Sequence, residues 1–139
     1  MVRVFVYGTL KEGFPNFHLN HGKRLDGDFV TQQSFPLYLI GERHSPWLML
    51  SAGLGHPIKG QVFSVSDEIL AAMDKLERCD QANGYKRVTV QVMCLQTGNV
   101  LEVYMYGKPS ILLDIKEIKA ELHGEYGQEH ARLYRSRSL

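Results

Sequence analysis

A glutamate on the apolar side of a predicted helix is the first residue of this sequence that could perform chemistry. Ser66 can cap a helix that we expect to run through Arg78, because a serine hydroxyl accepts an orphan backbone N–H and the acidic residues that follow favour the positive end of the helix dipole. With about 100° of rotation per residue, Glu77 falls between Leu70 and Met73 in the apolar arc. A carboxylate in that position can take up and release protons.

The cost of burying a carboxylate leaves three interpretations of Glu77 open. A buried acid is usually paired with a cation, shifted towards its neutral form, or used for proton transfer. A structural role, in which the carboxylate lies at the rim of the core or is held by an arginine such as Arg87, therefore stands beside the catalytic one. Hydrophobic periodicity does not decide between them, because helix registers read from a sequence err by a residue or two.

A second candidate site follows the first predicted strand. Residues 2–7 are β-branched and aromatic on both faces of the alternation, which suits a strand buried on both sides. Gly8, Gly13 and Pro15 then favour an ordered loop. Glycine lets the main chain approach a ligand closely, so the backbone N–H groups of this loop are candidate hydrogen-bond donors. Read alone, the side chains around Gly8 could equally be ordinary core residues at a strand end.

The elements that must position these residues are mostly short strands. Strand-like runs bounded by Gly, Pro, Ser or Asp occur at 29–31, 37–40, 47–50, 61–65, 87–95 and 100–106. The last two are joined by a glycine-containing loop of hairpin length and should pair antiparallel. Ile115, Ile118 and Leu122 fall at helical spacing, which predicts a short helical segment. Short strands around one main helix predict a single α+β domain over residues 1–139, with a curved or barrel-like sheet.

Composition argues against several classes of partner. Sixteen Lys and Arg face fifteen Asp and Glu, for a net charge of +1, so no strong field gathers nucleic acid or an acidic membrane surface. The apolar runs are far shorter than the roughly 20 residues of a membrane span, and the chain opens as a strand and not as a signal peptide. Two cysteines make no disulfide framework. We expect a cytoplasmic monomer without nucleic-acid or membrane partners.

No metal or cofactor site is expected. No pair among the six histidines has the spacing of a common zinc site. The loop at 8–13 has flanking glycines but lacks the Gly-Lys-Ser/Thr ending of a phosphate-binding loop. Cys79 lies two residues after Glu77, but no motif supplies an adjacent base to activate its thiol, so we expect it to be passive.

Two motifs together resemble a known family. The first is Val-Phe-Val-Tyr-Gly-Thr-Leu-Lys at 4–11 with Pro15-Asn16, and the second is Met-Asp-Lys-Leu-Glu at 73–77 with Tyr85-Lys86-Arg87. They resemble the γ-glutamyl cyclotransferase-like family, and within it the enzymes that act on γ-glutamylamines. The resemblance covers roughly residues 1–106. It implies a mixed β-barrel with flanking helices, a catalytic glutamate at Glu77, and a substrate loop made of Tyr7, Gly8, Thr9 and Leu10.

The activity implied by the resemblance needs no protein nucleophile. The substrate's own α-amino group attacks its γ-carbonyl carbon, which yields 5-oxo-L-proline and a free amine, expected to be lysine from the γ-glutamyl-ε-lysine of degraded transglutaminase crosslinks. Glu77 would take the α-ammonium proton and return it to the departing nitrogen. Backbone N–H groups from Gly8 to Leu10 would bind either the glutamyl carboxylate or the oxyanion. The alternatives are a cyclotransferase for γ-glutamyl amino acids or glutathione, and a non-catalytic binding barrel.

Overall fold

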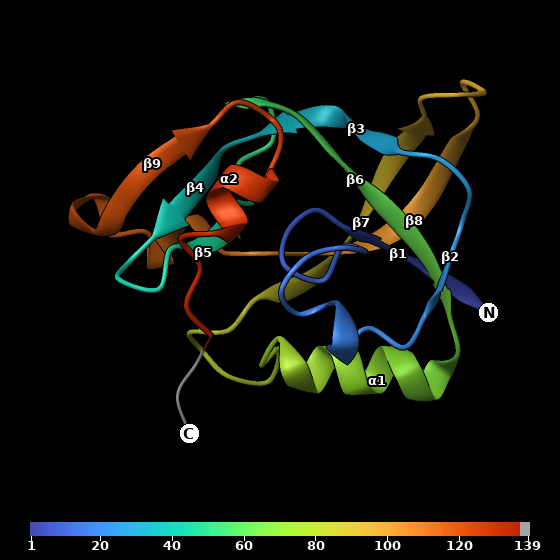
Figure 1. The fold of residues 1–139 in the computed structure, drawn as a ribbon, viewed down its shortest axis with the longest axis horizontal. Coiled ribbons are helices and arrows are strands. Elements are labelled where there is room, and N and C mark those ends of the chain that lie inside the picture. Colours follow the sequence, from blue (N-terminus) through green and yellow to red (C-terminus); the bar gives the residue numbers. More distant parts are fainter. Residues whose placement is uncertain (137–139) are drawn as a thin grey trace.

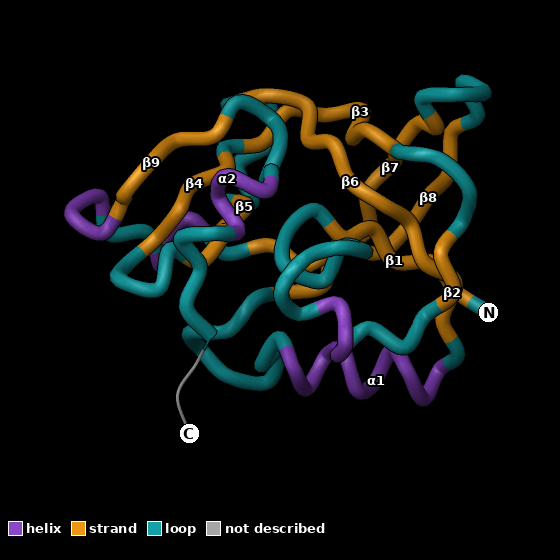
Figure 2. Tube along the Cα trace, viewed as in Figure 1, coloured by secondary structure: helices purple, strands orange, loops and turns teal. Residues whose placement is uncertain are grey.

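The computed structural model describes residues 1–136 and consists mainly of β-strands (Figure 1, Figure 2). The strands are β1 (Val2–Val6), β2 (Lys23–Arg24), β3 (Phe29–Phe35), β4 (Leu37–Ile40), β5 (Ser45–Leu48), β6 (His56–Val65), β7 (Lys86–Cys94), β8 (Val100–Gly107) and β9 (Ile118–Leu122). The helices are α1 (Asp67–Leu76) and α2 (Gln128–Ala131), with 3-10 turns η1 (Phe17–Leu19), η2 (Ser110–Leu112) and η3 (Ile115–Glu117). No helix in this part of the chain is long and apolar enough to cross a membrane.

The larger sheet is mixed and curves back on itself. Its strand order is β1-β8-β7-β3-β6-β2, and β1 additionally pairs with β6, so five of the strands form a nearly closed ring. Strand β1 runs antiparallel to β6 and parallel to β8. The expected hairpin between β7 and β8 is present, with antiparallel pairing from Lys86 opposite Gly107 to Met93 opposite Val100. The predicted α+β class with a curved, mixed sheet is confirmed.

A smaller sheet of order β5-β4-β9 lies at one end of the ring, where α2 also packs (Figure 1). The predicted helical segment around Ile118 is wrong, because residues 118–122 form β9 and pair antiparallel with β4. Ile118, Ala120 and Leu122 alternate with exposed residues and face inward, which is the period-2 pattern of a strand. Ile115 does not share this face, because it lies in the 3-10 turn η3 and is 76% exposed.

Strand β1 separates two hydrophobic clusters. Phe5 belongs to the cluster inside the ring, whereas Val4 and Val6 belong to a second cluster between the sheet and α1. From the helix side, Leu70 and Met73 complete this second cluster. The central strand is therefore buried on both faces, as its composition predicted, and α1 has a single apolar face to place against it.

Helix α1 begins as predicted and ends earlier than predicted. The Ser66 hydroxyl accepts a hydrogen bond from the Ile69 N–H at 3.2 Å. The helix stops at Leu76 and does not reach Arg78, because Arg78 has left-handed backbone angles with φ of 57°. Glu77 keeps helical angles and donates its N–H to the Met73 carbonyl at 2.9 Å. The direction of the Glu77 side chain therefore still follows the helical register.

Candidate active site

The predicted glutamate and the predicted loop line the same cavity. This cavity has a volume of about 1100 Å³ and opens beside the end of α1. Its walls include Glu77, the whole Tyr7–Leu10 segment, and Tyr85 from the second sequence motif. Residues from several strands, from α1 and from the loops between them meet here, so that Tyr7 and Glu77, 70 positions apart in the chain, line one cavity. One small ligand could contact the carboxylate and the loop main chain together.

The loop after β1 lines the cavity and leaves three of its amide groups without an acceptor among residues 1–136. Its carbonyls are used within the protein: Gly8 O accepts from the Lys11 N–H at 3.1 Å and Thr9 O accepts from the Asn16 N–H at 2.8 Å. The amide N–H groups of Gly8, Thr9 and Leu10 donate no hydrogen bond to any residue in the range 1–136. Three N–H donors at a cavity wall are suited to an oxyanion or a carboxylate.

Packing against Pro46, as well as access of a ligand to the main chain, favours glycine at position 8. A β-carbon added to Gly8 would lie 2.9 Å from Cγ of Pro46, which also lines the cavity. Any larger residue would push the loop away from β5 or displace Pro46. The glycine therefore allows the loop after β1 to lie directly against the smaller sheet.

Tyr7 and Leu10 are core residues that also line the cavity. Each is 7% exposed, and both belong to the hydrophobic clusters. The Tyr7 hydroxyl donates to the carbonyl of Tyr106 at 2.7 Å. Burial, and after it the nearby charge of Glu77, raise the pKa of Tyr7 well above its ordinary value. The structural and the ligand-facing interpretations of these side chains are thus compatible.

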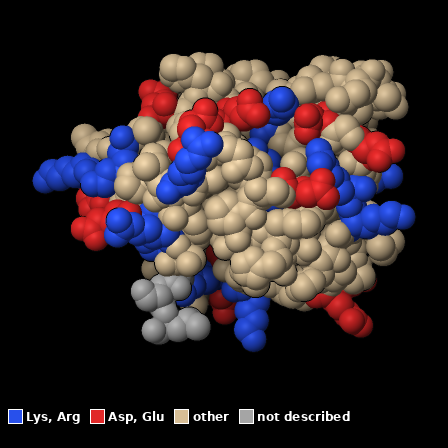
Figure 3. All heavy atoms as spheres, in the orientation of Figure 1, with Lys and Arg blue, Asp and Glu red and all other residues tan. Residues whose placement is uncertain are grey.

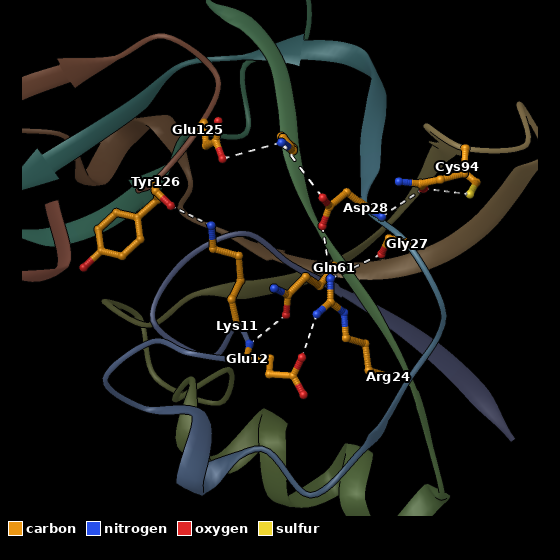
Figure 4. A network of polar contacts seen from close by, with 11 residues as sticks. Lys11, Glu12, Arg24, Gly27, Asp28, Gln61, Cys94, Glu125 and Tyr126 are labelled. Carbon is orange, nitrogen blue, oxygen red and sulfur yellow. Dashed lines mark hydrogen bonds and ion pairs between the residues drawn. The ribbon is translucent and has the colours of Figure 1, made fainter. Parts of the chain in front are cut away.

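The far side of the loop is held by a polar network that runs towards the C-terminal segment (Figure 4). The buried Lys11 ammonium donates to the carbonyl of Tyr126 at 2.6 Å and lies 4.1 Å above the ring of Phe14. The N–H of Glu12 donates to the side-chain carbonyl of Gln61 on β6 at 2.7 Å. The main chain on the cavity side is therefore held in one conformation from behind.

The carboxylate of Glu77 has no polar partner among the residues that the structure describes. Within residues 1–136, no hydrogen bond or ion pair involves its side chain. The other acid near the helix end, Asp74, accepts from the Tyr106 hydroxyl at 2.6 Å and pairs with Arg87 at 2.8 Å. Arg87 thus neutralises Asp74 and not Glu77, which removes the arginine-held interpretation of Glu77.

Burial dominates the electrostatics of Glu77. Desolvation raises the pKa of its carboxyl to about 7, against a smaller opposing effect of the Lys108 charge. A carboxyl group with this pKa is present in both protonation states near neutral pH, which suits a group that first accepts and then donates a proton.

Lys108 is a site residue that the sequence analysis missed. It directly follows β8 and is 6% exposed. Its ammonium donates to the carbonyl of Asn83 at 2.6 Å and lies over the rings of Trp47 and Tyr85, at 4.3 and 4.5 Å. Burial lowers the pKa of Lys108, and the Glu77 charge partly offsets this. No spacing in the sequence connects Lys108 to Glu77, because the pairing of β8 with β1 and β7 brings them together.

Tyr85, which belongs to the second sequence motif, makes hydrogen bonds at both the helix end and β5. Its N–H donates to the carbonyl of Glu77 at 3.0 Å, and its hydroxyl donates to the carbonyl of Pro46 at 2.9 Å. The tyrosine therefore links the helix end to β5 and forms the wall between them. The residues from 78 to 84 make the turn that returns the chain to this position.

The C-terminal segment supplies the remaining wall of the cavity. Tyr134 lines it, and the Tyr134 hydroxyl accepts from the side-chain amide of Asn16 at 3.1 Å and from the guanidinium of Arg43 at 3.2 Å. The sequence analysis did not assign Tyr134 or Arg43 to the site. A tyrosine near the end of a chain gives no local signal of where its ring will pack.

Within residues 1–136, the histidines and cysteines join no metal cluster, and the Cys79 thiol is not activated. Both cysteines are free, and burial raises the pKa of the Cys79 thiol, which disfavours the reactive thiolate. In residues 1–136 no three His, Cys, Asp or Glu side chains are grouped as a metal site would require. Charges of both signs are mixed over the face of the molecule shown in Figure 3.

Comparisons with known proteins agree on one family. Residues 4–128 match the family model described as gamma-glutamyl cyclotransferase, AIG2-like. The chain is 39% identical over 101 residues to gamma-glutamylaminecyclotransferase of Mus musculus, covering 69% of this chain and 66% of the relative. It is 31% identical over 114 residues to gamma-glutamylaminecyclotransferase C of Danio rerio, covering 76% and 74%. The match thus spans slightly less than two thirds of the mouse protein and about three quarters of the zebrafish one.

Solved structures give the same result for the fold. The crystal structure of an aig2-like protein from Mus musculus superimposes with a TM-score of 0.84 at 31% identity, covering 100% of this chain and 98% of that one. An uncharacterised protein from Pyrococcus horikoshii shares the fold with a TM-score of 0.63 at 21% identity, covering 95% of each chain.

Replacing Glu77 with glutamine is expected to stabilise the fold at alkaline pH. The pKa of Glu77 is raised to about 7 in the folded chain, whereas an unfolded glutamate titrates near about 4.3. The unfolded chain therefore loses this proton first, and the native state loses stability as pH rises through that window. We expect E77Q to exceed the parent chain in unfolding free energy by about 1–3 kcal/mol at pH 8 and to match it near pH 4.

Urea denaturation at the two pH values measures this difference. Glu102→Gln is the matched control, because Glu102 is exposed on β8 and should give little change at either pH. A parent chain that is more stable than E77Q at pH 8 would show that the fold stabilises the Glu77 carboxylate and would contradict the cost of its burial.

Proposed function

This chain belongs to the γ-glutamyl cyclotransferase, AIG2-like family, and we propose that it converts a γ-glutamylamine to 5-oxo-L-proline and a free amine. The expected substrate is γ-glutamyl-ε-lysine. The observation that carries the proposal is the unpartnered Glu77 carboxylate in one cavity with the free amides of Gly8, Thr9 and Leu10. We further propose that the chain folds as one domain, acts as a monomer, and works in the cytoplasm, which suits its two free cysteines.

The first step is proton removal from the substrate. The Glu77 carboxylate accepts one proton from the α-ammonium group, and the free amine then attacks the γ-carbonyl carbon of the same molecule. Intramolecular attack is fast when the reacting atoms are held close together, so the cavity must keep the glutamyl group folded. The loop amides are suited to this task, because they can hold the α-carboxylate or stabilise the oxyanion of the tetrahedral intermediate.

The second step is loss of the amine. The bond between the γ-carbon and the leaving nitrogen breaks while Glu77 returns its proton to that nitrogen. One of the two protons still on the attacking nitrogen is also transferred to the departing amine, so that the lactam keeps one N–H and the lactam and ammonium products balance the substrate. A carboxyl group whose pKa lies near 7 can perform both transfers at neutral pH.

Lys108 sets the pH range in which Glu77 can exchange protons, because its charge affects the pKa of Glu77. Its positive charge opposes the effect of burial and keeps the pKa of Glu77 from rising further. The ammonium is itself fixed by Asn83 and by the rings of Trp47 and Tyr85, so that its charge stays close to the cavity. We assign Lys108 a positioning and tuning role towards Glu77.

Glu77→Gln is expected to remove the activity while preserving the fold. Glutamine fills the same volume but accepts no proton, and general acid–base groups contribute about 10²- to 10⁴-fold to a rate. Release of 5-oxo-L-proline from γ-glutamyl-ε-lysine should fall by at least about 100-fold. Glu102→Gln should keep the parent rate. Undiminished turnover by E77Q would exclude Glu77 from the mechanism and leave the binding-module alternative open.

The pH profile should report the pKa of Glu77. We expect kcat/KM to rise with pH and to reach half its plateau near pH 7, because the reaction begins with the ionised carboxylate.

Lys108→Met removes the charge that stabilises the Glu77 carboxylate and should move this ascending limb to higher pH, with several-fold lower kcat/KM at pH 7. Lys75→Met, at an exposed lysine of α1, is the control and should leave the midpoint in place. A midpoint that Lys108→Met does not move would separate Lys108 from the titration.

A further inference from the structure

The turn between β4 and β5 carries an arginine at the cavity that the proposed chemistry does not use. Arg43 and its neighbour Glu42 both line the cavity. Gly41 and His44, on either side of them, have left-handed backbone angles with φ of 71° and 53°. The Gly41 N–H donates to the carbonyl of Glu117 at 2.8 Å, which ties the turn to η3. The turn is therefore a defined structure that presents two charged residues to the cavity.

The guanidinium of Arg43 is held in place on one side only. Its Nε donates to the carbonyl of Arg135 at 3.0 Å and one Nη donates to the Tyr134 hydroxyl at 3.2 Å. The Arg135 N–H returns a hydrogen bond to the carbonyl of Arg43 at 2.9 Å. These contacts use two of the five N–H groups of an arginine. Among residues 1–136, no carboxylate lies within ion-pair distance of Arg43.

Arg43 and Glu77 act on the same cavity from different positions. The charges of both groups affect the pKa of the Tyr85 phenol. Burial raises this pKa, the Glu77 charge raises it further, and the Arg43 charge lowers it. Arg43 and Glu77 nevertheless form no ion pair with each other. A ligand whose γ-glutamyl group reaches Glu77 can therefore extend its other end towards Arg43.

We propose that Arg43 forms a subsite for a carboxylate on the leaving amine, which makes the preferred substrates γ-glutamyl conjugates of amines that carry a carboxylate. This subsite rests on the proposed cyclisation at Glu77. The free edge of the guanidinium matches the two oxygens of a carboxylate, which an arginine can bind through parallel hydrogen bonds. Glu42, next to it in the turn, provides a countercharge for the ammonium group of an amino acid.

Two substrates that differ by a single carboxylate test the subsite. The conjugate γ-glutamyl-ε-lysine carries that group, and γ-glutamylcadaverine has the same chain and amine without it. We expect the parent chain to prefer the lysine conjugate in kcat/KM by about 10- to 100-fold, the range for a charge-assisted bidentate contact. In Arg43→Met this ratio should fall close to one, mainly through a higher KM for the lysine conjugate.

Further variants separate recognition from packing. Arg43→Lys keeps the charge and loses the planar fork, and it should keep part of the preference. Arg132→Met, at an exposed arginine of the C-terminal segment, is the matched control and should keep the parent ratio. Circular dichroism checks that each variant is folded. An Arg43→Met variant that keeps the preference, or that loses the two activities equally, would overturn the proposal, because Arg43 would then act only by holding Tyr134.

The proposed function and the subsite can fail separately. Equal kcat/KM for the two conjugates in the parent chain would overturn the subsite and leave cyclisation intact. If neither conjugate is cyclised, the proposed function fails. Calorimetric titration of E77Q and of E77Q/R43M with the two conjugates then measures the preference without turnover. If E77Q binds the lysine conjugate more tightly and E77Q/R43M does not, the subsite is supported. If E77Q itself shows no preference for the lysine conjugate, the subsite is overturned.

Discussion

The packing of α1 against β1 and β6 is the constraint on which the site depends. Leu70 and Met73 must face the sheet, because they complete the cluster around Val4 and Val6. The same register carries Glu77 to the cavity at the helix end, where the pKa of its carboxyl is raised and no residue in the range 1–136 pairs with it. The free energy of burying the apolar face thus offsets the cost of desolvating one carboxyl group. An ordinary amphipathic helix thus places a carboxyl group with a raised pKa at the cavity.

The position of β1 in the ring determines what this acid meets. Because β1 pairs with both β6 and β8, the loop that follows it emerges beside the end of β8, where Lys108 begins the next segment. The loop amides, the glutamate and the lysine come from three parts of the chain that share no sequence pattern. The strand pairings are rigid, so the groups are held in place without contacts among themselves. This arrangement leaves the donors of the loop and the oxygens of Glu77 free for a ligand.

The opposite wall of the cavity is formed by weaker and more distant contacts. The turn between β4 and β5 meets the C-terminal segment through hydrogen bonds to Arg43, and Tyr134 is shared between that turn and Asn16. Variation there would change the shape of the leaving-group side without disturbing the ring or the helix. In the proposed reaction, the groups assigned to the glutamyl moiety therefore lie on a different wall from those assigned to the leaving amine.

Local patterns in the sequence were enough to place Glu77 and the loop after β1. The serine cap, the apolar arc of α1 and the hairpin of β7 and β8 depend on residues close to each other in the chain, and all three are present. The helix was predicted to end two residues too late. Glycine is the usual sequence signal for left-handed backbone angles at a helix end, and here an arginine, Arg78, adopts them. The character of β9 was misread for a similar reason, since only its pairing with β4 distinguishes a strand from a helix in so short a segment. Lys108, Arg43 and Tyr134 reach the cavity through closure of the ring and docking of the C-terminal segment, and such long-range contacts leave no spacing in the sequence from which they could be read.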